Sequence, residues 1–174
     1  MATHASKRLS ELSQVLWRER EDLEMVVFKL EEQRLLLEGR SARWLCRASQ
    51  ELDAVLDELA AIELNRAVAS AAAAAELGIS ESSSLRTLAG VAPAPWPSVF
   101  NRHFRALVRL VEEIIDLADN NRELLEAGLA EVQRTMGGRH QASTRMLVDA
   151  AAYSAALATN DRVLQPSLVD AVVG

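Results

Sequence analysis

Histidine and cysteine are the residues of this chain that could bind a metal ion or serve as a catalytic base or nucleophile. His4, His103 and His140 lie far apart, and Cys46 is the only cysteine. A zinc or diiron centre needs such residues at short helical spacings, as in His-Glu-x-x-His or Glu-x-x-His, and neither motif occurs. Cys46 directly follows Leu45 in a helical pattern, so we expect it to fill space within a helix. We expect His103 at the edge of a helical bundle.

Acidic residues occur in adjacent pairs, and paired carboxylates could perform acid–base chemistry. The pairs Glu31–Glu32 and Glu112–Glu113 both lie on the polar side of a helical pattern, which is typical of a solvated face. The chain has no glycine-rich phosphate loop, no dinucleotide-binding fingerprint and no nucleophile elbow. The sequence therefore predicts a protein that is not an enzyme and that uses no metal and no cofactor.

Composition and charge exclude several other classes of protein. Hydrophobic residues make up 49% of the chain but aromatic residues only 4%, so aliphatic side chains must form the core. The net charge of -6 argues against a nucleic-acid-binding protein and against docking on anionic membranes. No apolar stretch reaches the roughly 18 residues of a membrane span, and the N-terminus lacks the apolar core of a signal peptide. We expect a cytoplasmic protein without stable membrane insertion.

Leucines recur at every seventh position along the first segment of the chain. They are Leu9, Leu16, Leu23, Leu30 and Leu37. In the second apolar row, Leu12 and Val26 alternate with Glu19 and Gln33. This is the pattern of a coiled-coil helix across four heptads, and it predicts a helix over residues 9–37 with the five leucines in the core.

Two further long helices are predicted, over residues 42–77 and 98–136, with Ser98 as the N-cap of the latter. Between them, residues 79–97 contain three prolines and form a crossover with one short helix. Trp96 stands between two of these prolines, and we expect it to anchor the crossover. Asn121 falls on the apolar seam of the last long helix, where a polar residue fixes register or oligomeric state at some loss of stability.

Residues 138–174 are predicted to form a hinge and a C-terminal tail after a helical bundle of residues 1–137. The tail contains a short helix over residues 143–158, which Asn160 is expected to end. One face of this helix carries the candidate partner-binding residues Met146, Ala150, Tyr153 and Leu157. Two arrangements remain open: the helix folds back as a fourth helix of the bundle, or it is a mobile docking helix for a partner groove.

Together these segments predict an all-α fold: an elongated antiparallel bundle of three long coiled-coil-like helices plus a short C-terminal helix. Trp17 and Trp44 lie near helix seams, and we expect them to pack in the core. Because no catalytic motif is present, the bundle favours a role in binding another protein. A different class of function stays open, that of a structural coiled-coil adaptor or scaffold that associates with itself.

Several stretches of the chain carry a resemblance to a known family. They are VLWRERED, LEMVVFKLEEQRLLL, RWLCRASQELDAVLDEL and ELNRA, followed by LRTLAGVAPAPW and NNRELLEAGLAEV. Over about residues 9–136 the chain resembles the FlgN family of flagellar export chaperones, particularly its actinobacterial branch. The resemblance implies a cytosolic type III export chaperone, monomeric or weakly dimeric. Such a chaperone binds the C-terminal region of hook-filament junction (hook-associated) proteins, prevents their premature assembly and delivers them to the export gate.

The resemblance also bears on the tail. In the FlgN family the C-terminal part of the chaperone takes part in substrate binding, and a tyrosine there is implicated in docking at the export gate. The residues after Gly138 depart from the short glycine-containing segment that surrounds this tyrosine in the family. The resemblance therefore implies a binding role for the tail without assigning the gate-docking role to Tyr153.

Overall fold

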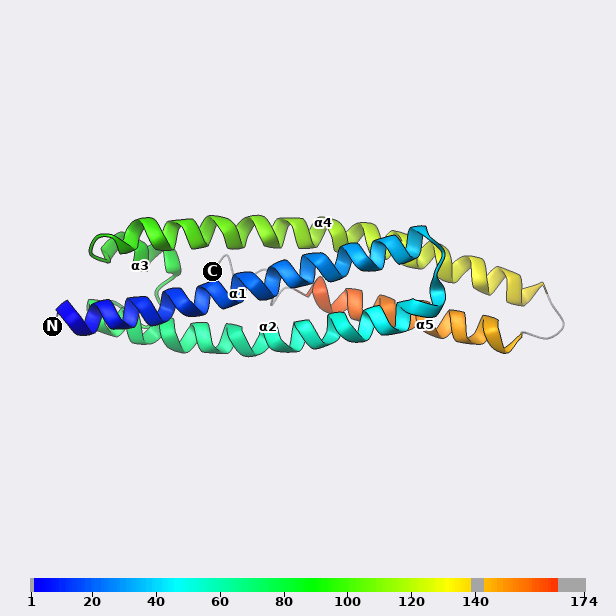
Figure 1. The fold of residues 1–174 in the computed structure, drawn as a ribbon, viewed down its shortest axis with the longest axis horizontal. Coiled ribbons are helices and arrows are strands. Elements are labelled where there is room, and N and C mark those ends of the chain that lie inside the picture. Colours follow the sequence, from blue (N-terminus) through cyan, green and yellow to red (C-terminus); the bar gives the residue numbers. More distant parts are fainter. Residues whose placement is uncertain (1, 139–142, 166–174) are drawn as a thin grey trace. The chain divides into compact units, whose positions relative to one another are not determined.

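The structure is a computed structural model that describes residues 2–138 and 143–165, with side chains described from residue 6 onward. These residues form five helices and no strand, which confirms the predicted all-helical class (Figure 1). The helices are α1 (Ala2–Glu38), α2 (Ala42–Leu77), α3 (Leu85–Val91), α4 (Trp96–Gly137) and α5 (Thr144–Val163). The predicted hinge falls mostly on residues 139–142, which lie outside the described residues.

The start of α4 differs from the sequence-based prediction. The helix begins at Trp96, so Ser98 is not its N-cap but a residue of its first turn. Pro97 is tolerated there because the first amide groups of a helix have no intrahelical acceptor. The Ser98 hydroxyl instead donates a hydrogen bond to the Pro95 carbonyl (2.8 Å). The predicted start was therefore two residues too late.

The end of α5 also differs. Asn160 was expected to end this helix, but α5 continues to Val163. Asn160 is fully buried, and its side-chain amide donates to the carbonyl of Ala118 on α4 (2.8 Å). A tertiary hydrogen bond thus holds the side-chain nitrogen of Asn160, which would otherwise compete with the helix backbone.

The chain divides into two compact units, and each is described by itself. Among the described residues, unit 1 contains residues 2–24 and 57–111, and unit 2 contains residues 25–56, 112–138 and 143–165. Unit 1 thus holds the first part of α1, the second part of α2, α3 and the first part of α4. Unit 2 holds the remaining parts of α1, α2 and α4 together with α5.

The core of unit 1 is built from aliphatic side chains and one phenylalanine. The largest fully buried side chains are Leu9, Leu12, Leu16, Leu23, Leu59, Leu88, Phe100 and Leu107. Trp96 is half-buried and stacks on Phe100, with 5.7 Å between the ring centroids. Ser84 caps α3 by accepting a hydrogen bond from the Thr87 amide (3.3 Å). Because both rings belong to α4, this stacking lies within one helix, and the role of Trp96 as anchor of the crossover stays a prediction.

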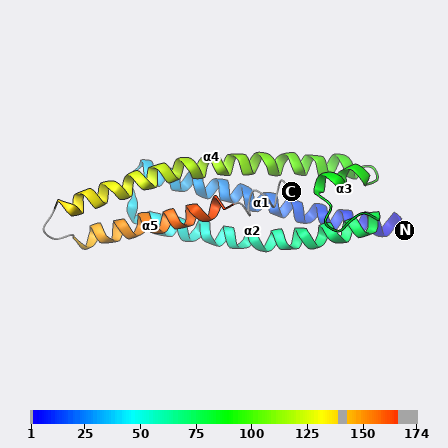
Figure 2. The same cartoon turned by 180° about the vertical axis from the view of Figure 1, so that it is seen from behind.

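The core of unit 2 continues the same leucine row. Leu30 is fully buried and Leu37 is 7% exposed. Seen from both sides, α5 lies beside the first part of α2 and the last part of α4 (Figures 1 and 2). The position of α5 determines which of the predicted partner-binding residues are exposed.

Candidate partner-binding surfaces

Unit 2 contains a buried polar pair at the interface of α1 and α4. Gln33 is 1% exposed and Asn121 is fully buried. The side-chain amide of Asn121 donates to the Leu30 carbonyl (2.8 Å) and to Oε1 of Gln33 (3.1 Å). Sliding α4 along α1 by one turn would break both bonds and leave polar groups buried without partners. The pair therefore holds the two helix segments in one register.

In unit 1 the corresponding residue of α1 is a carboxylic acid. Glu19 is fully buried, and its Oε1 lies 3.2 Å from Nε of Arg66 on α2. Burial raises the pKa of the Glu19 carboxyl to about 7; the Arg66 guanidinium opposes this rise, and Glu63 and Asp22 add to it. Near neutral pH, Glu19 is therefore present in both its charged and its protonated form.

His103 lies in the core of unit 1 and not at a bundle edge, so that expectation was wrong. It is 2% exposed, its Nε2 lies 3.2 Å from Oγ of Ser13, and its ring meets the edge of Trp17 with 5.3 Å between the centroids. It comes three positions after Phe100 and four before Leu107, which places it on the buried face of α4. That spacing was readable in the sequence.

The predicted partner-binding face of α5 points into unit 2. Tyr153 is 8% exposed, and Met146, Ala150 and Leu157 are half-buried. The buried apolar cluster that includes this face consists of Leu37, Leu45, Leu125, Ala152, Tyr153 and Ala156. Of the two arrangements that the sequence leaves open, the structure has α5 folded back within unit 2.

The ring of Tyr153 occupies a place that only glycine leaves open. A Cβ atom on Gly128 of α4 would lie 2.3 Å from Cε1 of Tyr153 and 2.6 Å from its Cζ. Any side chain at residue 128 would therefore displace the ring. Because glycine inside a helix is destabilising by about 1 kcal/mol relative to alanine, close packing is the physical reason for a glycine here.

Polar contacts hold the C-terminal end of α5. The Thr159 hydroxyl donates to the Asp53 carboxylate (2.9 Å), and Arg162 forms an ion pair with the same carboxylate. The Asn160 amide bonds the Ala118 carbonyl, as described above. Hydrogen bonds are directional, so they fix the position of α5 along its axis, while the apolar cluster supplies contact area.

A pocket of about 240 Å³ opens beside Tyr153, where α5 meets α4 and the turn between α1 and α2. Its apolar wall includes Ala42, Val132 and Met146, and its charged rim includes Arg40, Glu131 and Asp149. Burial, with smaller contributions from Asp149 and Glu131, raises the pKa of the Tyr153 hydroxyl. The phenol is therefore protonated at physiological pH.

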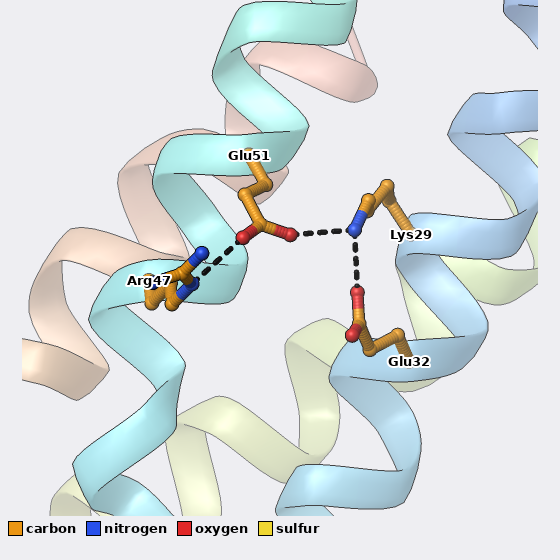
Figure 3. Close-up of polar contacts among 4 residues, drawn as sticks. All are labelled: Lys29, Glu32, Arg47 and Glu51. Carbon is orange, nitrogen blue, oxygen red and sulfur yellow. Dashed lines mark hydrogen bonds and ion pairs between the residues drawn. The ribbon is translucent and has the colours of Figure 1, made fainter.

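Charged side chains link α1 to α2 in unit 2 (Figure 3). Nζ of Lys29 lies 2.9 Å from Glu32 and 2.6 Å from Glu51, and Nε of Arg47 donates to the other oxygen of Glu51 (2.8 Å). These hydrogen bonds raise the pKa of Lys29 and lower the pKa of Glu51. Because the network is partly exposed, it orients side chains more than it stabilises the fold.

The same network borders a second pocket, of about 360 Å³. Leu36, Trp44 and Ala48 form its apolar wall, and Glu32, Arg47 and Glu51 form its rim. An apolar pocket with a charged rim is a common form of binding site for an apolar side chain of another polypeptide.

Trp17 and Trp44 are not core residues, so that expectation was wrong. They are 50% and 48% exposed, and Cys46, expected as filler, is exposed as well. Each is adjacent in sequence to a buried leucine, Leu16 or Leu45. Neighbouring residues point about 100° apart around a helix, so these three side chains turn away from the leucine row. This sequence signal could have identified them as surface residues.

The described residues contain neither a cluster of metal-ligating side chains nor a membrane-spanning helix. They contain no group of three or more His, Cys, Asp or Glu placed to hold a metal ion. Within the same part of the chain, no helix has an apolar stretch long enough to cross a bilayer. His140 and the side chain of His4 lie outside the described residues. What unit 2 does present is two apolar pockets with charged rims.

These features define an all-helical protein with two pockets on unit 2. The chain matches the sequence model described as FlgN protein over residues 1–158 of its 174. It therefore belongs to the FlgN family, which is a family of flagellar export chaperones and not of enzymes. The predicted resemblance to this family is confirmed, and its actinobacterial branch stays a prediction. No curated protein and no solved structure matches the chain.

Proposed function

We propose that this protein is a cytoplasmic type III flagellar export chaperone for hook-filament junction (hook-associated) proteins. It binds the C-terminal region of such a protein, prevents premature assembly, delivers the protein to the export gate and catalyses no reaction. The observation that carries the proposal is the match to the FlgN family over residues 1–158. The apolar pockets of unit 2 support it, since an amphipathic helix needs such a surface.

The proposal extends to how the chain is organised. We propose that residues 1–137 act as an elongated antiparallel bundle of three long helices, that residues 138–174 act as its tail, and that the chaperone is a monomer or weak homodimer. In this arrangement the bundle supplies a rigid scaffold. The tail supplies the part that responds to the substrate.

The proposed substrate contacts are Met146, Ala150, Tyr153 and Leu157, together with the cluster that α5 covers. α5 has 20 residues, and most of the stability of a helix in a protein comes from the packing of its apolar face. Its docking rests on one apolar cluster and a few polar contacts. When α5 moves away, Leu37, Leu45 and Leu125 become available to an amphipathic segment of the substrate. The free energy of detaching α5 opposes binding, so moderate affinity is expected.

Binding is tested by titrating the full chain with a purified hook-associated protein in a calorimeter, and by sedimentation of each protein alone and mixed. We expect a complex with the C-terminal region of the substrate and a chaperone that sediments alone as a monomer or weak dimer. A chaperone that forms a stable oligomer alone and ignores the substrate would instead be the self-associating adaptor.

Movement of α5 is tested separately with a covalent lock. In a Cys46→Ser background, Asp53→Cys and Thr159→Cys place two thiols where a hydrogen bond now joins α2 to α5. We expect the oxidised protein to bind the substrate at least tenfold more weakly than the same protein after reduction. Equal affinity in the two states would show that the substrate does not replace α5.

A further inference from the structure

One side of α4 carries a row of charged residues, all of them exposed. They follow one another at alternating steps of three and four residues, which places them on one side of a helix. All belong to the single helix α4, so their arrangement follows from the repeat of this one element. We call this set the α4 charged stripe, and it consists of Arg102, Arg105, Arg109, Glu112, Asp116 and Asp119.

The charges of the stripe are divided along the helix. The first half of the stripe contains only arginines and the second half only acids, so the stripe as a whole is neutral in a chain of net charge -6. The described ion pairs of α4 are made by Arg122 and Glu131 and involve no residue of the stripe. The charges of the stripe are therefore available to a partner whose charges run in the opposite order.

A second copy of the chain has this opposite order when two copies of α4 lie antiparallel. The steps between the stripe residues read the same in both directions along the helix. A two-fold axis between residues 110 and 111 would therefore bring each arginine opposite an acid of the copy. Each pair would occur twice, because a two-fold interface uses the same surface on both copies. The pairs are Arg102 with Asp119, Arg105 with Asp116, and Arg109 with Glu112.

Other arrangements of the two helices are less favourable. A parallel pair in register would set arginine against arginine and acid against acid. Sliding the antiparallel copy by one heptad in one direction would set Arg105 opposite Arg109. Sliding it in the other direction would set Glu112 opposite Asp116. Because like charges placed opposite one another destabilise a complex, the order of charges selects one orientation and one register.

Two further acids lie close to the stripe on α4. Glu113 and Glu123 are both exposed. In the same antiparallel register, Glu113 would lie opposite Val108 of the copy and Glu123 opposite Ser98. Neither acid would therefore face a like charge directly, and the register that pairs the stripe does not place them against each other.

We propose that two copies of this chain associate antiparallel through the α4 charged stripe. Exposed ion pairs are individually weak and are screened by salt, so the dimer dissociates readily and depends on ionic strength. The inference deepens the proposed function, because it rests on the weak homodimer proposed above and assigns its surface. No stripe residue belongs to the cluster that α5 covers or to the residues packed against that cluster.

The test is sedimentation equilibrium of the full chain at about 0.03 M and about 0.5 M salt. We expect a monomer–dimer equilibrium whose dissociation constant rises about tenfold or more with salt. Arg105→Asp should weaken association about tenfold or more, because it sets two acids opposite each other in both symmetric pairs. Adding Asp116→Arg should restore association, since residue 116 lies opposite residue 105 in the proposed register. Adding Asp119→Arg instead should not, although the two double variants have the same composition and net charge.

Three results would overturn the inference: a chain that stays monomeric at low salt up to about 1 mM protein, association that Arg105→Asp leaves unchanged, or equal recovery in both double variants. Circular dichroism checks that each variant keeps the helical content of the parent protein. The same variants are titrated with a hook-associated protein in a calorimeter. A chain that dimerises but binds no substrate would contradict the chaperone role alone, and a chain that binds substrate but never dimerises would contradict the role of the stripe alone.

Discussion

Units 1 and 2 contain the same irregularity in sequence and accommodate it differently. In each, a polar residue replaces an apolar one in the second row of α1, and it is fully or almost fully buried. In unit 1 that residue is Glu19, which is paired with the Arg66 guanidinium at 3.2 Å. In unit 2 it is Gln33, which accepts a hydrogen bond from the Asn121 amide. One unit buries an ionisable pair and the other a neutral one.

The difference shows how the two kinds of buried polar contact act. Removing two charges from water is unfavourable by several kcal/mol per ion, so a buried ion pair adds little stability and responds to pH. Two amides carry no net charge, so their contact is insensitive to pH and acts through direction and register. Unit 1 is therefore the part of the protein whose stability should depend on protonation, and unit 2 the part whose register should depend on shape.

The largest effect is expected from an unpaired carboxylate in unit 1. Leu23→Asp places a second acid in the α1 core, at a residue that is 1% exposed. We expect a loss of roughly 3–5 kcal/mol in the free energy of unfolding, measured by urea denaturation followed by circular dichroism.

Met25→Asp serves as the matched control for Leu23→Asp, because residue 25 lies on the same helix and is 45% exposed. We expect its effect to stay within about 0.5 kcal/mol. Equal midpoints for Leu23→Asp and the parent protein would mean that the leucine row is not the core.

The next largest effect concerns pH in unit 1. The pKa of the Glu19 carboxyl is raised from 4.5 to about 7. Its contribution to the free energy of unfolding is therefore fully present below pH 4.5 and is lost as the pH rises towards 7. Burial, with the charges of Arg20 and Arg102, lowers the pKa of His103 from 6.5 to about 4. The contribution of His103 to the free energy of unfolding is therefore fully present above pH 6.5 and is lost as the pH falls towards 4. Each contribution amounts to about 3 kcal/mol, and the two oppose each other between these values.

Single substitutions should separate the two opposing dependences of unfolding free energy on pH. Relative to the parent protein, Glu19→Gln should become more stable as the pH rises from about 4.5 to 7, and His103→Gln should become more stable as the pH falls from about 6.5 to 4. The measurement is urea denaturation at half-unit pH intervals. If the unfolding free energies of all three proteins changed with pH in parallel, Glu19 and His103 would not make the stability of unit 1 depend on pH, and the contrast with the neutral pair of unit 2 would fail.

A smaller effect is expected where α5 packs on α4 in unit 2. Gly128→Ala puts a methyl group into the Tyr153 ring, so we expect α5 to be displaced and unit 2 to lose roughly 1–3 kcal/mol. Hydrogen exchange of the α5 amides should rise at least tenfold. Gly137→Ala is the control, because a Cβ there meets no atom within 4 Å, and alanine there should be neutral or slightly stabilising. Unchanged exchange in Gly128→Ala would show that Tyr153 does not hold α5 in place.

The smallest effect tests the neutral pair itself. Asn121→Leu leaves the Gln33 amide and the Leu30 carbonyl buried without this partner, which should destabilise unit 2 by about 1–2 kcal/mol. Adding Gln33→Leu should recover part of that loss, because it removes the Gln33 amide group, whose nitrogen is buried without a hydrogen-bond partner. The loss should be the same at pH 5 and pH 7. A loss that varied with pH would contradict the assignment of a neutral pair.

The sequence identified the elements well wherever the signal was local. The predicted helix over residues 42–77 has the bounds of α2, and the five leucines of the first row are all buried. The resemblance to the FlgN family is confirmed by the family model, which matches residues 1–158. One error arose where a contact from another helix decided the outcome, as for the continuation of α5 through Asn160. The burial of His103 and the exposure of Trp17 and Trp44 were instead readable from their spacing to neighbouring core residues.

The sequence by itself determined that the chain is helical, which face of each long helix is apolar, and where Glu19, Gln33 and Asn121 interrupt the apolar rows. All three depend on the spacing of residue types over a few helical turns, which can be read from residues close together in the sequence. Only the tertiary structure decided that Arg66 meets Glu19 and that Tyr153 rests on Gly128, because such partners are distant in sequence. A helical period fixes the direction in which a side chain points, but not which other segment fills the space before it.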